Sequence, residues 1–476
     1  MKNNSQFHTH NSKLFRQILF SYLPRIVSFS VGPILIALLT KNLSVEEFGI
    51  FTIFRDTCFL MIFIFGFGLN RYIANFVPGK KINEQYSIYK TIFSIEFLIF
   101  TSISLLIVIP FRRFFLSLLK IQGYSFEFMI FVCAFIVYII YLEGINFLGY
   151  LKRLEIKSVF AFSEKVLYFL MILFLSFYGM NLRNISFVFL ILHIVLLIFL
   201  IFFIDIKRVL NAAFQKNIIV KAFSFGLPLL ATDIGWRVMR NVDRYILSAN
   251  SLDKEVGIYA FGFKYVEIAY LVGSPVIWTI YPYLVESFNL NKFKDAANYL
   301  SRQVQISFYL VCGALSGLIV FRNEFVPLLS KKEYLAYPFV FSYMAICVIT
   351  MTTIYIFQQI VILMGEGKRL GVYYLICTCL NILLNIILIP IYGIYGALIA
   401  TVISMFLLSV LIILRTKKKF ELSFYKNSIF YFLLSLLVIL SLYDVDSFFY
   451  RVVGYLPYVV IYIIIFFRKI LKILKN

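Results

Sequence analysis

The sequence predicts an all-α polytopic membrane protein. Of its 476 residues, 62% are hydrophobic and 14% are charged, and the mean hydropathy is +0.91. No soluble fold has enough interior to hide that fraction of apolar side chain. Apolar runs long enough to cross a bilayer recur along the whole chain. In lipid a backbone satisfies its own hydrogen bonds as helix, so these runs predict transmembrane helices.

The apolar runs divide into about fourteen crossings with short connections, which leave no room for a soluble domain. We expect them at residues 14–40, 48–75, 86–110, 126–149, 157–179, 185–205, 219–247, 256–286, 297–321, 335–364, 369–389, 394–415, 425–442 and 450–468.

Basic residues indicate the orientation of these crossings. With the N-terminus inside, the inner segments hold roughly three times as many Lys and Arg residues as the outer segments, as the positive-inside rule requires. Both termini are therefore expected in the cytoplasm. The formal charge of +22 is explained by these loops, so no nucleic-acid partner is expected.

An internal repeat predicts two lobes of parallel topology. The segment Leu39–Phe51 aligns without gaps on Leu247–Tyr259, an offset of 208 residues (247 minus 39), and Gly149–Leu154 aligns on Gly365–Leu370. Repeats of this kind indicate lobes related by a pseudo-twofold axis along the membrane normal. We expect six helices in residues 1–208, six in 209–420 and two additional helices in 421–476, with a central cleft between the lobes.

The seventh predicted crossing carries charges, which are costly in a bilayer. Asp233, Arg237, Arg240 and Arg244 are spaced by four, three and four residues, so they share one face of a helix. An intramembrane charged stripe indicates a functional site. The alternative is that Asp233 and Arg237 neutralise each other and serve only to hold helices together.

The repeat places further charges at equivalent positions. At the 208-residue offset, Arg25 falls on Asp233 and Asp56 falls on Lys264. Since equivalent residues face each other across a pseudo-twofold axis, we expect helices 1, 2, 7 and 8 to line the cleft. The alternative is a coincidence among several buried charges.

Three segments resemble one transporter family. They are Leu43–Ile50, Asn241–Leu247 followed by Val256–Tyr259, and Asn381–Thr401, the last of which contains Pro390 and Gly393. The chain resembles, over almost its whole length, the polysaccharide flippases of the multidrug/oligosaccharidyl-lipid/polysaccharide exporter superfamily, in the O-antigen and capsule branch. The motifs separate this superfamily from other transporters better than they separate its branches.

The resemblance implies movement of a polyprenyl-pyrophosphate-linked oligosaccharide from the inner to the outer leaflet of a bacterial cytoplasmic membrane, by alternating access of the two lobes. The polar head needs a wet cationic cleft, while the tail can stay among membrane lipids. Arginine and lysine side chains bind phosphate through charge-assisted hydrogen bonds. The candidates for substrate binding are Arg25, Arg55, Lys90, Arg237, Arg240 and Lys264.

Intramembrane acids are candidates for coupling to H⁺ or Na⁺. They are Asp56, Glu164, Asp233 and Glu267. The alternative for each one is that it neutralises a buried Arg or Lys. No catalytic residue, cofactor or metal site is expected, and a polysaccharide polymerase is an expected partner of such a flippase.

Other functions stay open at this point. A multidrug or organic-cation exporter of the superfamily would be expected to have a cleft dominated by acids, whereas basic residues predominate here. A peptidoglycan-precursor flippase also has fourteen helices and a cationic cleft, so topology does not exclude it. An enzyme is disfavoured because the sequence offers no large loop, Gly-rich phosphate loop or metal-ligand pattern.

Overall fold

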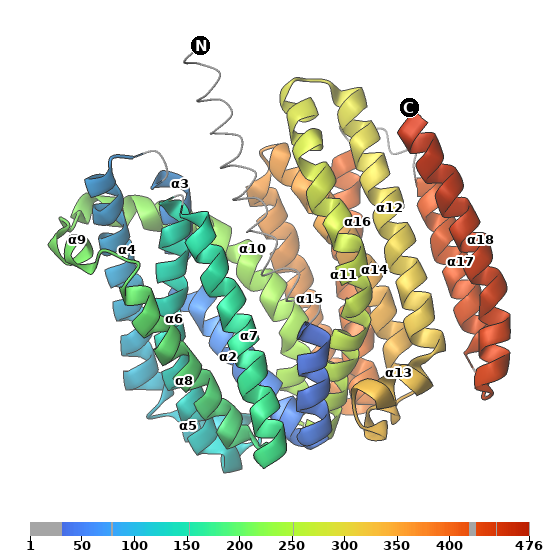
Figure 1. Cartoon of the computed structure of the whole chain (residues 1–476), viewed down its shortest axis with the longest axis horizontal. Helices are drawn as coiled ribbons and strands as arrows, with labels where there is room; N and C mark the ends of the chain where they lie inside the picture. Colours follow the sequence, from blue (N-terminus) through green and yellow to red (C-terminus); the bar gives the residue numbers. More distant parts are fainter. Residues whose placement is uncertain are drawn as a thin grey trace. The chain divides into compact units, whose positions relative to one another are not determined.

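The computed structural model describes residues 31–77, 80–151, 153–250, 252–417, 425–443 and 445–475, and these ranges contain helices and connections without strands. Two compact units divide the chain, Met1–Gly257 and Ile258–Asn476. Figure 1 shows long helices running side by side within each unit. The boundary of these units follows contacts within the chain, and the division at residues 208 and 420 expected from the repeat stays a prediction.

The first unit begins, in its described part, with the helix Val31–Asn42. It continues with α2 (Val45–Phe65), α3 (Leu69–Phe76), α4 (Ile82–Ile103), the π-helical turn η1 (Ser104–Val108), α5 (Arg112–Leu118), η2 (Gln122–Tyr124), α6 (Ser125–Tyr150), α7 (Leu154–Tyr178), α8 (Leu182–Ile201), α9 (Ile206–Asn211) and α10 (Lys216–Ala249).

The helix α11 (Asp253–Asn289) begins in the last residues of the first unit and continues through the second. The second unit then contains α12 (Phe293–Val320), α13 (Arg322–Leu329), η3 (Lys332–Leu335), α14 (Val340–Leu363), α15 (Gly367–Tyr392), α16 (Ile394–Lys417), α17 (Tyr425–Leu442) and α18 (Phe448–Lys475).

A helix lies at every predicted crossing within the described residues, so the all-α polytopic prediction is confirmed. Ten helices in this part of the chain are long and apolar enough to span a membrane. The helix α10 is not one of the ten, and it carries the charged stripe. The short helices α5, α9 and α13 were not expected from the sequence.

The second crossing differs from its prediction as one helix over 48–75. The chain breaks at Gly66–Gly68, where Phe67 and Gly68 have φ of 48° and 68°, and α3 starts anew at Leu69. Gly226 of α10 packs against this break so closely that a Cβ on Gly68 would lie 2.7 Å from its carbonyl oxygen. The left-handed backbone and this close approach both favour glycine at position 68.

The internal repeat of the sequence matches the positions at which two helices begin. The helices α2 and α11 begin at Val45 and Asp253, which are 208 residues apart. A Cβ on Gly49 would lie 2.9 Å from the Asp253 carbonyl oxygen, and a Cβ on Gly257 would overlap the Val45 carbonyl. Equivalent residues thus make reciprocal contacts, as a local twofold arrangement requires.

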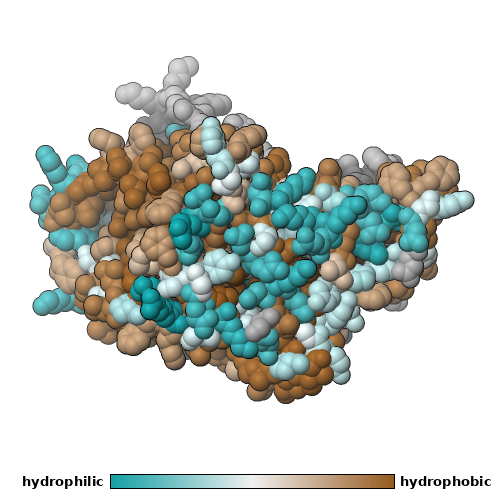
Figure 2. All heavy atoms as spheres, turned by 90° about the horizontal axis from the view of Figure 1, so that it is seen from below, coloured by the Kyte–Doolittle hydropathy of each residue, from teal (hydrophilic) through white to brown (hydrophobic). Residues whose placement is uncertain are grey.

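Large apolar side chains remain exposed on many helices, including Leu106 (71%), Phe177 (78%) and Leu440 (71%). In Figure 2 hydrophobic residues, in brown, form much of the visible surface, while hydrophilic residues gather across the middle of this view. Since such exposure is unfavourable in water, these side chains face the hydrocarbon of the membrane.

Polar contacts join the middle of α15 to α16 in the second unit. Asn381 donates to Thr401 Oγ1 at 3.4 Å and accepts from Asn385 at 3.2 Å, and all three side chains are buried. At the other end of these helices, Glu366 accepts hydrogen bonds from Arg369 and Arg415.

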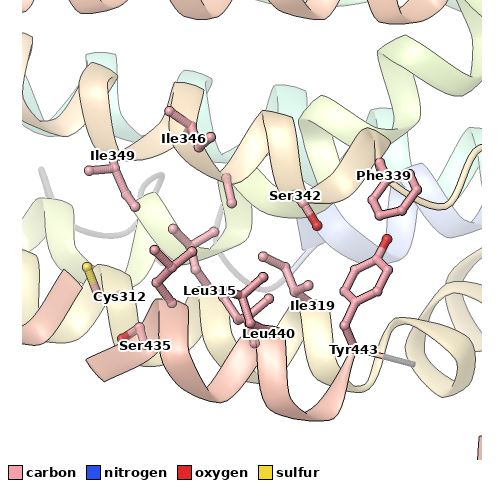
Figure 3. A pocket seen from close by; sticks show the side chains of 13 residues that line it. Cys312, Leu315, Ile319, Phe339, Ser342, Ile346, Ile349, Ser435, Leu440 and Tyr443 are labelled. Carbon is pink, nitrogen blue, oxygen red and sulfur yellow. The ribbon is translucent and has the colours of Figure 1, made fainter. Parts of the chain in front are cut away.

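The additional helices of this unit pack beside α12. Arg322 of α13 lies over the Tyr443 ring at 3.7 Å, and Arg451 of α18 pairs with Glu324. Between α12, α14 and α17 lies an apolar cavity of about 240 Å³, to which Ser342 contributes a hydroxyl (Figure 3). The two last helices therefore belong to the packed structure of this unit.

Candidate functional site

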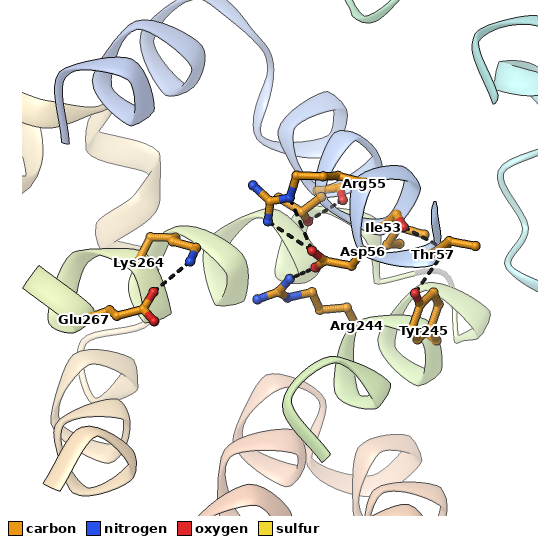
Figure 4. A network of polar contacts seen from close by, with 10 residues as sticks. Ile53, Arg55, Asp56, Thr57, Arg244, Tyr245, Lys264 and Glu267 are labelled. Atoms are coloured by element: carbon orange, nitrogen blue, oxygen red, sulfur yellow. Dashed lines mark hydrogen bonds and ion pairs between the residues drawn. The ribbon is translucent and has the colours of Figure 1, made fainter. Parts of the chain in front are cut away.

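The first unit holds an ionic network inside the membrane-spanning region, on α2 and α10 (Figure 4). Asp56 accepts hydrogen bonds from Arg55, at 3.1 Å from Nη2, and from Arg244. Asp56 is 8% exposed and Arg244 only 4%. Burial makes this pairing obligatory, because a buried charge without a partner is strongly destabilising.

The hydroxyl groups of the following residues extend the network. Thr57 Oγ1 lies 3.0 Å from the hydroxyl of Tyr245, so α2 and α10 are joined at two successive positions of each helix. The structure shows Arg244 paired with Asp56, which lies 188 residues away along the chain.

Asp233 lies farther along the same face of α10 and pairs with Arg71 of α3. Arg71 Nη2 is 2.8 Å from Asp233 Oδ1, and Arg71 Nε is 3.2 Å from Oδ2, so the contact is bidentate. The two side chains are 46% and 27% exposed. This pair is therefore more accessible than the Asp56–Arg244 pair.

Two further arginines of the stripe lie over aromatic rings. Arg237 stacks on Phe63 of α2, with its guanidinium carbon 3.5 Å from the ring centroid. Arg240 lies 5.6 Å from the ring of Trp236 on its own helix. A guanidinium over an aromatic face keeps its N–H groups at the edge, where they can donate to an anion.

The stripe as a whole has excess positive charge. From Phe51 to Phe65 in α2, throughout α3, and from Phe223 to Leu247 in α10, the charged residues are Arg55, Arg71, Arg237, Arg240 and Arg244 against Asp56, Asp233 and Asp243. Five arginines and three aspartates leave a formal excess of two positive charges. In a membrane-spanning region such an excess favours an anionic ligand.

The other predicted site residues lie elsewhere. Lys90 of α4 donates to the carbonyls of Leu210 and Ala212, at 2.6 and 2.9 Å, and so joins α4 to the end of α9. Glu164 of α7 lies 3.9 Å from His193. In the second unit, Lys264 pairs with Glu267 at 2.7 Å, one turn along α11. Arg25 lies outside the described residues.

The sequence interpretation missed several polar residues. Arg71 is not among the substrate-binding residues predicted from the sequence, although the structure pairs it with Asp233 of the stripe. Glu96 of α4 and Glu143 of α6 are 6% and 5% exposed. Asn70 of α3 lies close to both carboxyl groups. The signal available for these two acids was their position inside apolar runs.

Comparisons with known proteins found a family model and a distant relative. The family model described as "Polysaccharide biosynthesis protein" matches residues 14–288. A protein of Haloferax volcanii named probable low-salt glycan biosynthesis flippase Agl15 is 24% identical over 182 residues, which span 38% of this chain and 39% of that protein.

Two solved structures have a similar fold. The lipid II flippase MurJ, in an inward closed conformation, matches with a TM-score of 0.72 and 18% identity, over 95% of this chain and all of MurJ. The MATE multidrug transporter DinF-BH matches with a TM-score of 0.61 and 14% identity, over 88% of this chain and 96% of that one. At these identities the likeness shows the fold alone.

The helices long and apolar enough to span a membrane define a multi-pass membrane protein, and its fold is like those of MurJ and DinF-BH. Within that class the chain belongs to the polysaccharide biosynthesis protein family, whose model covers more than half of its length.

Proposed function

We propose that this protein is a flippase that moves a polyprenyl-pyrophosphate-linked oligosaccharide from the inner to the outer leaflet for the synthesis of a surface polysaccharide such as O-antigen or capsule. The observation that carries the proposal is the arginine excess on α2, α3 and α10. Pyrophosphate and acidic sugars are anions, and they cannot cross hydrocarbon unaided.

The proposed binding group is Arg237, Arg240 and Arg55, with Arg71 added from the structure. Arg237 is oriented by Phe63 and Arg71 by Asp233. Arg244 has a different role, because it is buried against Asp56 and holds α10 to α2. Bidentate guanidinium contacts suit a pyrophosphate better than lysine point charges do.

The transport step that we propose is alternating access of two lobes, without covalent chemistry. We also propose that the protein lies in the bacterial cytoplasmic membrane with both termini in the cytoplasm. Its proposed protein partner is a polysaccharide polymerase. Asp56, Asp233, Glu164 and Glu267 remain candidates for H⁺ or Na⁺ coupling. Asp56, Asp233 and Glu267 each form an ion pair with an arginine or lysine side chain. The geometry therefore favours, for these three acids, the role of neutralising a neighbouring basic side chain.

Liposomes test this function. The purified protein is reconstituted with a labelled polyprenyl-pyrophosphate oligosaccharide in one leaflet, and the exposure of its sugar head at the other surface is followed. We expect protein-dependent exposure that Arg237→Ala/Arg240→Ala lacks. Exposure retained by the double variant would remove the stripe from the mechanism.

A second candidate function is the flipping of a peptidoglycan precursor, which the fold likeness to MurJ supports. The same liposome assay distinguishes the two candidate functions, because it compares two lipid substrates that differ in their head groups. Movement of the peptidoglycan precursor alone would favour this candidate. Uptake of a soluble organic cation without movement of either lipid would favour a drug exporter.

A further inference from the structure

The first unit contains a second cavity, distinct from the arginine stripe. It has a volume of about 330 Å³ and lies between α2, η1, α5, α6 and α10. It extends along α2 from Ile53 to Phe65, which is about 18 Å of helix at 1.5 Å per residue. The lining also includes Met61, Phe115, Leu116 and Phe128.

This cavity suits a hydrocarbon chain. Among its described lining residues, only Thr57 and Tyr245 contribute side-chain hydroxyls, and these two lie 3.0 Å from each other. A buried water needs two to four polar partners, so an apolar space of this kind does not hold water well. An empty space would forfeit the dispersion contacts of its lining. In a membrane protein the available filler is a lipid chain.

Positively charged residues lie next to the lining residues of α5 in the sequence. Arg112 precedes the lining residues Phe115 and Leu116 by three and four positions, so it lies on the same face of α5 one turn away. Its Nη1 donates to the Ile109 carbonyl at 2.8 Å, while its buried Nε has no acceptor among the described residues. Arg113 beside it is exposed. A phosphate oxygen would satisfy the free N–H.

The helix α5 is placed to hold an amphiphile at a membrane surface. Phe114 and Leu118 are 58% and 57% exposed, next to Arg113, which is the combination of apolar and basic residues found at lipid interfaces. Ser248 at the end of α10 donates to the Leu119 carbonyl at 2.8 Å and fixes the end of α5. In the orientation predicted from the sequence, α5 lies at the outer surface.

We propose that this cavity binds the isoprenoid chain of the lipid-linked substrate, with its phosphate at Arg112 and Arg113. The occupant follows from continuity with the stripe, since Thr57 and Tyr245 directly follow Asp56 and Arg244 on the same helices. The inference rests on the proposed function and adds the place where the lipid is held at the outer surface.

Photolabelling tests the site. The full chain in liposomes is irradiated with a polyprenyl diphosphate that carries a diazirine in its chain, and the labelled peptides are mapped. We expect labelling of α2 and α5 that excess polyprenyl diphosphate prevents. Met61→Trp fills the cavity and should reduce labelling about tenfold, which corresponds to about 1.4 kcal/mol. Leu98→Trp, at a 65% exposed position of α4, should leave labelling unchanged.

The phosphate contact has its own variant. Arg112→Gln should raise about tenfold the concentration of polyprenyl diphosphate that is needed to prevent photolabelling. The concentration of an uncharged polyprenol that is needed should stay unchanged. Lys41→Gln, at an exposed position, is the control. Because Arg112→Gln does not alter the packing of the cavity, it keeps the test valid if Met61→Trp fails to fold.

Each outcome decides the proposal. Labelling that phosphatidylglycerol prevents as well as polyprenyl diphosphate does would assign the cavity to ordinary lipid and overturn the occupant. Sugar-head exposure in the same liposomes without labelling of α2 or α5 would overturn the site and leave the proposed function intact. Specific labelling without head exposure would support the site and contradict the proposed function.

Discussion

Gly49 and Gly257 pack backbone against backbone, although 208 residues separate them. A Cβ on Gly49 would lie 2.8 Å from the Gly257 nitrogen. The two residues occupy the same position of the internal repeat, so each half of the repeat contributes the same glycine to one helix crossing. This crossing lies at the starts of α2 and α11, the two helices that follow the equivalent connections of the repeat.

Alanine at either position should therefore destabilise the protein by about 1–3 kcal/mol, because overpacking forces the backbones apart. We expect the larger effect for Gly257→Ala, whose Cβ would overlap the Val45 carbonyl. Thermal unfolding in detergent measures the change. Gly32→Ala is the control, since a Cβ there meets nothing within 4 Å; an equal loss at all three positions would contradict the close crossing.

The buried ion pair Asp56–Arg244 should have a large interaction energy in the folded protein. Asp56→Ala leaves Arg244 without this partner and should cost about 3–5 kcal/mol of unfolding free energy. The double variant Asp56→Ala/Arg244→Leu should recover much of that loss, since it removes the unpaired charge. A double-mutant cycle measures the coupling. At the exposed pair Lys80–Glu84, Glu84→Gln should change stability by about 0.5 kcal/mol or less.

The stacking of Arg237 on Phe63 should matter for transport. Arg237→Lys keeps the charge but loses the planar guanidinium, and Phe63→Leu removes the ring beneath it. A cation–π contact contributes about 0.5–2 kcal/mol, so we expect each change to reduce flipping about twofold to thirtyfold. The liposome assay measures this rate. Phe174→Leu, a 60% exposed aromatic on α7, should flip normally.

In the second unit, Glu366 joins the start of α15 to the end of α16. Arg415 is 17% exposed and Arg369 is 50% exposed at this carboxylate. We therefore expect Arg415→Ala to destabilise the protein by about 1–3 kcal/mol, and Arg369→Ala by about 1 kcal/mol or less. Thermal unfolding compares them. Equal losses would mean that burial does not set the strength of these pairs.

The composition and the apolar runs were enough to predict the fold class and the approximate place of every long helix in the described residues, but not the short helices α5, α9 and α13. The reason is that a membrane imposes one requirement on every segment: enough apolar residues to cross, with backbone groups bonded inside the helix. The internal repeat and the charged stripe could also be recognised in the sequence, because both depend on the spacing of residues along the chain. The family resemblance rested on such local motifs, and the family comparison confirms it.

The partners of the intramembrane charges depended on the folded structure. Asp56 and Arg244 are 188 residues apart, and Arg71 and Asp233 are 162 apart. Spacing along one helix shows which charged residues share a face of that helix. It does not show which residues of other helices contact that face. The break at Gly66–Gly68 brought Arg71 into the site and Asn70 to Glu96 and Glu143. These contacts arise when distant helices pack, because only then do buried charges acquire their partners.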